Sequence, residues 1–207
     1  MLIARSRYQG VWNIIRFNWP LFLVALLTIV TSLICAAFVP HPWNVLFRAG
    51  GLLAFGSVIL SLVTSCMIYD RSSLYELTWL RHFSLNQESC IVNLSAGFDE
   101  TSEILKIRVP AEVIAMDFYD PVLHSEPSIR RARGVYSPSP ELLKVTTSSF
   151  PQPDESVDLI CMILSAHEVR KSDERTLFFS EARRILKPSG RIVVIEHLRD
   201  WANFFRL

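Results

Sequence analysis

The sequence lacks an excess of charge of either sign. Its 207 residues carry 21 lysines and arginines against 20 aspartates and glutamates, which leaves a formal net charge of +1. A nucleic-acid-binding domain usually shows a strong positive balance. The composition therefore gives no electrostatic reason to expect a nucleic-acid partner, and we expect none.

Cysteine is also scarce. The four cysteines, at positions 35, 66, 90 and 161, fit neither the short paired spacing of a zinc site nor a disulfide framework. Two lie in apolar segments and two lie in or beside expected strands, so they are best interpreted as small buried thiols. We predict no metal site.

Charge is absent from two long runs near the N-terminus, residues 21–39 and 49–68. At 1.5 Å per residue, each run is long enough to cross the roughly 30 Å hydrocarbon core of a bilayer. The connection, residues 40–48, is short and contains two prolines, which predicts an antiparallel hairpin. A cleaved signal peptide is the competing interpretation of the first run, but that run is long and a second follows at once. Since neither run has an internal carboxylate or histidine, we expect an anchor rather than a transport pathway.

Arginines flank this hairpin unequally. Arg48 alone lies in the connection, whereas Arg5, Arg7 and Arg16 precede the first run and Arg71 and Arg81 follow the second. Cytoplasmic segments carry the excess of positive charge. We therefore predict a multi-pass membrane protein with two spans, both of whose ends, and hence the globular part, are cytoplasmic.

The chain divides into three expected segments. Residues 1–70 form the anchor, residues 71–89 belong to a juxtamembrane amphipathic helix that starts near residue 69, and residues 90–207 form a globular domain. The apolar face of the juxtamembrane helix has two candidate partners, the domain and the bilayer surface, and the pattern does not decide between them.

From residue 90 onward, apolar strands alternate with helical patterns. Strands are predicted at residues 90–94, 112–116, 142–146, 157–163 and 191–196, and helices at 100–106, 127–133 and 173–186, with a last helix starting after residue 200. This alternation predicts an α/β, Rossmann-like fold with a parallel sheet covered by helices on both faces. The basic cluster of Arg130, Arg131 and Arg133 is interpreted as a solvated helix face, with contact to phosphate or lipid as the alternative.

The first strand runs into a tight turn that contains Gly97, and the second strand ends about twenty residues later at Asp117. In an open α/β sheet, such a turn and acidic residue border the crevice that holds an adenosine-bearing ligand. The fingerprint for NAD needs three glycines in the turn. Only one is present, which disfavours NAD.

Two stretches of the second half carry a resemblance. Residues 150–159 read Phe-Pro-Gln-Pro-Asp-Glu-Ser-Val-Asp-Leu, and residues 180–196 read Ser-Glu-Ala-Arg-Arg-Ile-Leu-Lys-Pro-Ser-Gly-Arg-Ile-Val-Val-Ile-Glu. With residues 166–170 between them, they resemble class I S-adenosylmethionine-dependent methyltransferases of the type 11-like kind, over roughly residues 88–200. The family usually continues past its fifth strand, so the resemblance implies that the C-terminal strands are missing, in a truncated or degenerate member.

The resemblance also implies a set of cofactor-binding residues for S-adenosylmethionine. Asp99 would receive the ammonium group, Asp117 the ribose hydroxyls, and Phe118 or Tyr119 would lie against the adenine. The full expected set is Asn93, Ser95, Gly97, Asp99, Asp117, Phe118 and Thr146.

Candidate acid and base residues follow the fourth and fifth predicted strands. His167 and Glu168 come after the fourth strand, and Glu196 and His197 end the fifth. Either histidine could take a proton near neutral pH, which makes His167, Glu168 and His197 candidate catalytic residues. Arg170 and Glu196 are candidate substrate-binding residues, with Arg170 suited to an anionic head group.

These expectations combine into one predicted function. We expect the chain to be a membrane-anchored S-adenosylmethionine-dependent methyltransferase whose acceptor is a hydrophobic or membrane-associated small molecule delivered from the lipid bilayer. The alternative is a catalytically inactive, methyltransferase-like membrane protein that serves as a binding or assembly module. The identity of the acceptor and the oligomeric state, a monomer or an oligomer, stay open.

Overall fold

The computed structural model of the chain describes residues 5–124 and 126–197. The chain divides into two compact units, with the boundary between Leu74 and Tyr75. Each unit is described by itself.

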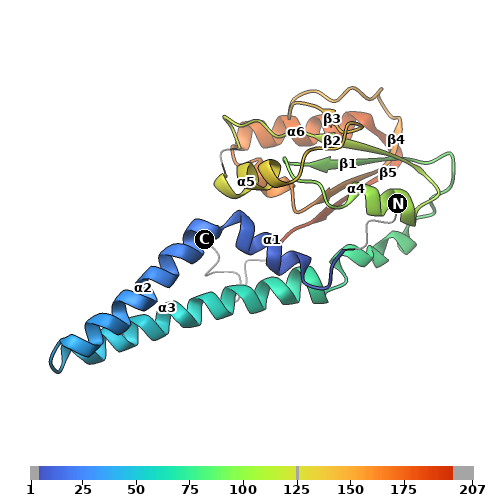
Figure 1. The fold of residues 1–207 in the computed structure, drawn as a ribbon. Coiled ribbons are helices and arrows are strands. Elements are labelled where there is room, and N and C mark those ends of the chain that lie inside the picture. The colour runs from blue at the N-terminus through green and yellow to red at the C-terminus, as the bar shows by residue number, and fades with distance from the viewer. Residues whose placement is uncertain (1–4, 125, 198–207) are drawn as a thin grey trace. The chain divides into compact units, whose positions relative to one another are not determined.

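The first unit is built from helices (Figure 1). α1 spans Gln9–Phe17, α2 spans Trp19–Phe38, and α3 spans Trp43–Ser65 and continues into a π-helical turn, η1, over Cys66–Arg71. α2 and α3 lie side by side as the predicted hairpin, although their connection is shorter than expected because the helix resumes at Trp43. A Cβ on Gly51 of α3 would lie 3.2 Å from Cβ of Ser32 on α2, so the small residue permits this close approach.

Both long helices of this hairpin are apolar enough to cross a membrane. Large apolar side chains are exposed along both helices, among them Leu21, Leu27, Leu52 and Leu53. Several hydroxyls on the two helices, including Thr28 and Ser57, donate to the carbonyl four residues earlier, which leaves their hydrogen-bonding capacity satisfied within the helix.

A buried carboxylate organises the start of α1. Asp70, whose side chain is 1% exposed, accepts the backbone N–H groups of Gly10 at 2.7 Å and Val11 at 3.0 Å. These are donors of the first helical turn that have no partner inside the helix, and a negative charge there also suits the helix dipole. Arg5 lies 3.8 Å from the same carboxylate. α1 is therefore tied to η1 within the first unit.

The continuous amphipathic helix predicted near residues 69–85 is wrong. The chain instead forms η1, which ends at Arg71, and two short 3-10 turns, η2 over Leu74–Glu76 and η3 over Thr78–His82. Leu77, which is buried, has a φ of 50°. This left-handed backbone separates the two 3-10 turns, and a helix cannot continue through it.

The second unit holds a five-stranded sheet (Figure 1). The strands are β1 (Cys90–Ser95), β2 (Glu112–Asp117), β3 (Leu143–Lys144), β4 (Val157–Ile163) and β5 (Leu186–Ile195), and the helices are α4 (Ser102–Arg108), α5 (Pro127–Val135), the 3-10 turn η4 (Ala166–Glu168) and α6 (Ser172–Ile185). All strand pairs are parallel, in the order β3-β2-β1-β4-β5. The predicted parallel α/β fold is confirmed.

Two strands differ from their predicted bounds by more than one residue. β3 is only two residues long, because the chain turns back on itself through a bridge between Thr146 and Ser149. β5 starts directly after α6, and a register shift in its pairing with β4 accommodates residues 187–190, which lie between the predicted helix and the predicted strand. The helix predicted after residue 200 lies outside the described residues.

The core lies on both faces of the sheet. Val92, Leu94, Ile160 and Met162 alternate along β1 and β4 and pack with residues of α6, in particular Phe178, Ala182 and Ile185. The residues between them on the opposite face, including Leu159 and Cys161, are equally buried, and burial raises the pKa of the Cys161 thiol to about 12. Figure 1 shows α6 on one side of the sheet and α4 and α5 on the other.

The strand order indicates where a ligand would bind to this sheet. β1 is flanked by β2 on one side and β4 on the other, so the chain reverses its direction of winding at β1. Ligands of open parallel sheets bind at such a reversal, outside the carboxyl ends of the strands. The residues that follow β1, β2 and β4 are therefore the ones to consider as a site.

Candidate active site

The turn after β1 is held together by its own side chains. Asn93, which is buried, donates through Nδ2 to the hydroxyls of Thr101 and Ser102, both at 2.9 Å. Asp99, two residues before the N-cap Thr101, accepts the backbone N–H groups of the same two residues at 2.9 and 3.0 Å and so ties the turn to the start of α4. Ser95 donates to the carbonyl of Met116 at 3.2 Å. In the described structure, these three predicted cofactor residues have structural partners.

Gly97 and Asp117 meet at the tips of β1 and β2. Ser95 pairs with Asp117 in the sheet, and two residues further on the Gly97 N–H donates to Asp117 Oδ1 at 2.6 Å. Gly97 has a φ of 94°, a backbone conformation that suits glycine. The structure therefore brings together the two residues that the sequence picked out from their spacing alone.

The second oxygen of Asp117 binds an arginine from α5. Arg133 Nη1 lies 2.6 Å from Asp117 Oδ2 and also donates to the carbonyl of Gly97 at 3.1 Å. The Arg133 guanidinium stacks over the ring of Tyr119, with its carbon 4.7 Å from the ring centroid. The Asp117 side chain is 3% exposed and that of Arg133 is 21% exposed, so the pair is largely shielded from water.

Two other predicted cofactor residues, Phe118 and Thr146, lie elsewhere. Phe118 is 1% exposed and packs edge to face on Phe178 of α6, with ring centroids 4.9 Å apart. Its side chain is part of the core and is not available to a ligand. Thr146 is exposed in the turn after β3, with its hydroxyl 3.4 Å from that of Ser148. Tyr119, which follows Phe118, is the aromatic residue that faces Gly97.

Comparison with known proteins identifies the domain. Residues 92–194 match the sequence model of the methyltransferase domain. The domain belongs to the class I S-adenosylmethionine-dependent methyltransferase family. This result confirms the resemblance seen in the sequence, and with it the predicted cofactor class, S-adenosylmethionine.

A curated relative supports the same family. An uncharacterized methyltransferase of the fission yeast Schizosaccharomyces pombe is 30% identical over 123 residues, which are 59% of this chain and 45% of the relative. The chain thus aligns with less than half of the length of that relative.

Solved structures of low sequence identity were also found. An S-adenosylmethionine-dependent methyltransferase of Methanosarcina mazei is 21% identical, with 63% of each chain covered and a TM-score of 0.46. A geranyl diphosphate C-methyltransferase of Streptomyces coelicolor, solved with S-adenosyl-L-homocysteine, is 17% identical, with 65% of this chain and 48% of that chain covered and a TM-score of 0.41.

The methyltransferase domain offers a hydrogen-bond acceptor that fits the cofactor at one point. A carboxylate at the tip of β2, beside a glycine with positive φ, can accept hydrogen bonds from a ribose diol. Of the predicted cofactor residues, Gly97 and Asp117 have this arrangement.

At the other half of the methyltransferase domain's carboxyl edge, His167 lies between two carboxylates. Its Nδ1 is 2.7 Å from Glu196 Oε2, and its Nε2 is 3.3 Å from Glu168 Oε1. The Glu168 side chain is 6% exposed, whereas that of His167 is 49% exposed. The cluster joins the loop after β4 to the end of β5, as the sequence predicts from strand order.

These contacts set the charge of the cluster. Hydrogen bonds to Glu168 and Glu196 raise the pKa of His167 to about 9. Burial alone would raise the pKa of Glu168, but the neighbouring His167 and Arg170 hold it below its ordinary value. At neutral pH, His167 is therefore a cation with both ring N–H groups directed at carboxylates, and it has no free nitrogen with which to accept a proton.

The remaining predicted residues lie around this cluster. Arg170 is exposed and pairs with Glu126, in the loop before α5, and it lies 3.6 Å from Glu168 Oε2. His197 follows Glu196 and is half-buried. Arg170 thus links the segments that follow β2 and β4.

Sequence reasoning missed two residues of this region. Arg133 was predicted to lie on a solvated helix face, but it binds Asp117. His124 is 2% exposed, accepts the Asp120 N–H at Nδ1 and directs Nε2 toward Glu174 Oε1 at 3.6 Å. Neither position is marked by a motif, because both contacts depend on how the segment after β2 folds back.

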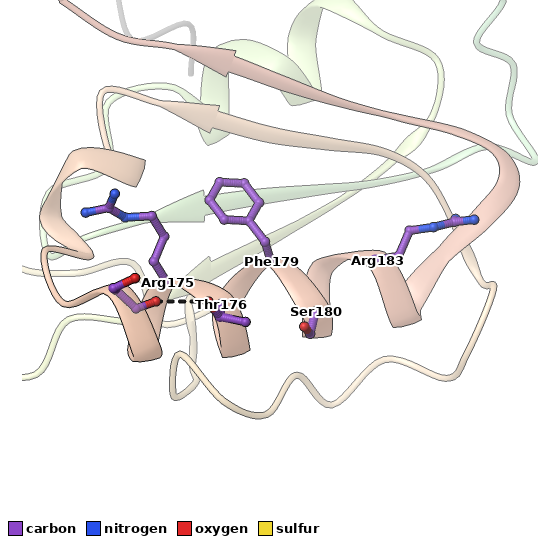
Figure 2. A pocket seen from close by; sticks show the side chains of 6 residues that line it. Arg175, Thr176, Phe179, Ser180 and Arg183 are labelled. Carbon is purple, nitrogen blue, oxygen red and sulfur yellow. Dashed lines mark hydrogen bonds between the residues drawn. The ribbon is translucent and has the colours of Figure 1, made fainter.

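Two open grooves are also found in the described part of the chain. One runs along α6 and is lined by Ser172, Arg175, Thr176, Phe179, Ser180 and Arg183 (Figure 2). Arg175 there donates to the carbonyls of Val169 and Arg170 and so fixes the start of α6 to the loop after β4. The other groove lies between the 3-10 turns at residues 76–85 and the end of α4.

Proposed function

We propose that the chain is a membrane-anchored S-adenosylmethionine-dependent methyltransferase that acts on a hydrophobic acceptor. The observation that carries this proposal is the contact between Gly97 and Asp117 at the tips of β1 and β2, within a domain of the methyltransferase family. Asp117 would hold the ribose of the cofactor, and Gly97 would allow the backbone to approach it.

The anchoring part of the proposal is supported by the surface of the first unit. Exposed leucines, valines and phenylalanines cover α2 and α3 over lengths of 20 and 23 residues. Contiguous apolar surface of this extent is unusual on a soluble protein and is favourable in lipid. We propose a cytoplasmic position for the domain because positive charge gathers at both outer ends of the hairpin.

A hydrophobic acceptor follows from the anchor. A domain tethered to a bilayer meets acceptors that stay dissolved in that bilayer far more often than a freely diffusing domain would. Lipids, quinones and other isoprenoid compounds are acceptors of this kind. The anchor thereby supplies proximity, which accounts for a large part of the rate in a transfer reaction.

The residues of the chain have distinct expected tasks in the reaction. S-adenosylmethionine, when bound, supplies a methyl group on a sulfonium centre. Glu168 Oε2 is buried and makes no hydrogen bond within the described residues, so it is placed to accept one from an acceptor hydroxyl. His167 and Glu196 position Glu168, and Arg170 would contact an anionic group of the acceptor.

A second function has one observation in its favour. Both carboxylate oxygens of Asp117 already accept hydrogen bonds from the chain itself. A non-catalytic methyltransferase-like module would keep such contacts permanently. It would bind no S-adenosylmethionine and methylate nothing in a membrane extract.

Methyl transfer to a lipid extract distinguishes the two functions. The full chain in liposomes is incubated with cofactor labelled at the methyl group and with total membrane lipid. We expect label in the organic phase, and at least a tenfold loss with Asp117→Asn, because a neutral amide cannot replace the charge-assisted hydrogen bonds of the carboxylate. The control is Asp173→Asn, an exposed carboxylate on α6, which should leave transfer unchanged.

Each other outcome is informative. Label that remains in water-soluble products would reject the hydrophobic acceptor and keep the methyltransferase. A protein that neither transfers label nor binds cofactor by calorimetry would reject the enzyme and favour the non-catalytic module.

A further inference from the structure

The features that suit Asp117 to a cofactor are used by the chain itself. The carboxylate accepts the N–H groups of Gly97 at 2.6 Å and Tyr119 at 3.1 Å through Oδ1, and the Arg133 guanidinium at 2.6 Å through Oδ2. The backbone bonds come from the turn and would persist with a ligand present. The bond from Arg133 comes from a side chain on a separate helix, α5.

The space beside Gly97, where a side chain would otherwise lie, is also filled by other residues. A Cβ built on this glycine would lie 2.8 Å from Ile129 Cγ2 on α5 and 2.8 Å from Tyr119 Cδ2. The space that a glycine leaves for a ligand is therefore filled by two side chains of the same segment that supplies Arg133. The segment 119–133 therefore supplies both the side chains that fill the space beside Gly97 and the cation that pairs with Asp117.

We propose that Arg133 is an internal competitor of the cofactor and sets its affinity for the domain. This inference rests on the proposed function, since it concerns the same site. In the described state, the guanidinium holds Asp117, Gly97 and the face of Tyr119 at once. The cofactor binds when Arg133 leaves Asp117 and the carboxylate exchanges a guanidinium for a ribose diol.

The physical reason is the unequal strength of the two partners. A hydrogen bond between a guanidinium and a carboxylate is roughly twice as strong as one between neutral groups, and the low exposure of this pair limits its screening by water. A diol competes poorly with such a cation. The apparent dissociation constant is then the intrinsic one divided by the fraction of molecules in which Arg133 has moved away.

The geometry of α5 makes the displacement local. Arg133 lies near the end of a nine-residue helix, and its neighbour Ala132 is buried and anchors that helix. A rotation of the Arg133 side chain alone releases Asp117 without moving the strand or the turn. Arg130 on the same helix is exposed and provides a matched control.

Calorimetric titration with S-adenosylhomocysteine tests the proposal without any turnover. The full chain in detergent micelles is compared with Arg133→Ala, Arg133→Gln, Arg133→Lys and Arg130→Ala. We expect Arg133→Ala and Arg133→Gln to bind about tenfold more tightly than the unaltered chain, since the competitor is gone. Arg133→Lys, which keeps the charge, should lie closer to the unaltered chain, and Arg130→Ala should match it.

A failure of this inference can be distinguished from a failure of the proposed function. Equal or weaker binding by both Arg133→Ala and Arg133→Gln would overturn the inference, while binding by the unaltered chain would preserve the proposed function. If no form releases heat with saturating ligand, the proposed function fails and the competitor role fails with it. Thermal unfolding monitored by circular dichroism verifies that each variant is folded, and Arg133→Gln, which keeps part of the stem over Tyr119, guards against misfolding of the alanine variant.

Discussion

The two halves of the sheet's carboxyl edge hold their charged groups in different ways. At β1 and β2, the Asp117 carboxylate is matched by Arg133, which reaches across from α5. At β4 and β5, the His167 ring is matched by Glu168 and Glu196, which lie in its own segment and on the adjacent strand end. The first half depends on a helix that is separate from the sheet, whereas the second depends on strand neighbours.

This difference bears on which half can change. A contact between adjacent strand ends follows from the sheet itself and persists as long as the sheet is folded. A contact from one side chain of a short helix can be broken without unfolding any strand. We therefore expect ligand-dependent change at β1 and β2 and a fixed arrangement at β4 and β5.

The largest effect tests whether the halves share one core. Phe178 is fully buried and its ring contacts those of Phe118 and Phe150, with centroids 4.9 and 5.8 Å apart. Phe178→Ala should lower the free energy of unfolding by about 3–5 kcal/mol, because it leaves a cavity between sheet and helix. Urea titration followed by circular dichroism measures this. Leu177→Ala, at an exposed position, should stay within about 0.5 kcal/mol, and an equal loss from both variants would contradict a shared core at Phe178.

The next effect concerns the β1 and β2 half alone. Gly97→Ala should cost about 1–3 kcal/mol, since φ is 94° and the new Cβ would lie 2.8 Å from Ile129 and Tyr119. Gly134 on α5 has no atom within 4 Å of a built Cβ. Gly134→Ala should therefore be neutral or stabilising in the same titration. A destabilisation at Gly134 that equals the one at Gly97 would show that the turn is not specially constrained.

The contribution of the β4 and β5 half to the free energy of unfolding should depend on pH. The pKa of His167 is about 9 in the folded chain against an ordinary value of 6.5. The stability that its ion pairs contribute is fully present below pH 6.5 and is lost as pH rises through 9. Because His167 is half exposed, we expect a loss of under about 1 kcal/mol. Unfolding measured from pH 6 to 10 should show this slope in the unaltered chain and a smaller one in His167→Gln; identical slopes would argue against the cluster.

The smallest effect concerns the link between the halves. Arg170 pairs with Glu126, and the two side chains are 58% and 37% exposed. An exposed pair contributes little, so Arg170→Ala should change the free energy of unfolding by no more than about 0.5–1 kcal/mol. The change should shrink further at high salt. A larger or salt-independent loss would mean that the link holds the two halves together.

Much of the fold could be predicted because its signals are local. β4 was predicted with its observed bounds, since a run of apolar residues between polar segments is typical of a central parallel strand. The interruption of the helix at Leu77 could not be predicted, because a left-handed backbone usually occurs at glycine and this position is a leucine. The apolar spacing around Leu77 and Leu80 instead suggested a continuous helix.

The candidate site divides in the same way. The closeness of Gly97 to Asp117, and of His167 to Glu196, follows from parallel strands whose carboxyl ends share an edge. The position of Phe118 in the core could not be predicted from the sequence. Side chains alternate along an extended chain, so one residue points into the core and the next points toward the turn. A shift of one position separates a core phenylalanine from the tyrosine that faces Gly97.

The sequence by itself therefore determined the succession of strands and helices along the chain, the apolar hairpin, the family and the pair of residues at the tips of β1 and β2. These properties depend on patterns within short segments and on the regular rules of parallel sheets. Only the tertiary structure decided that Arg133 binds Asp117 and that Ile129 and Tyr119 cover Gly97. Such contacts depend on side-chain directions from segments far apart in the chain, and no local pattern encodes them.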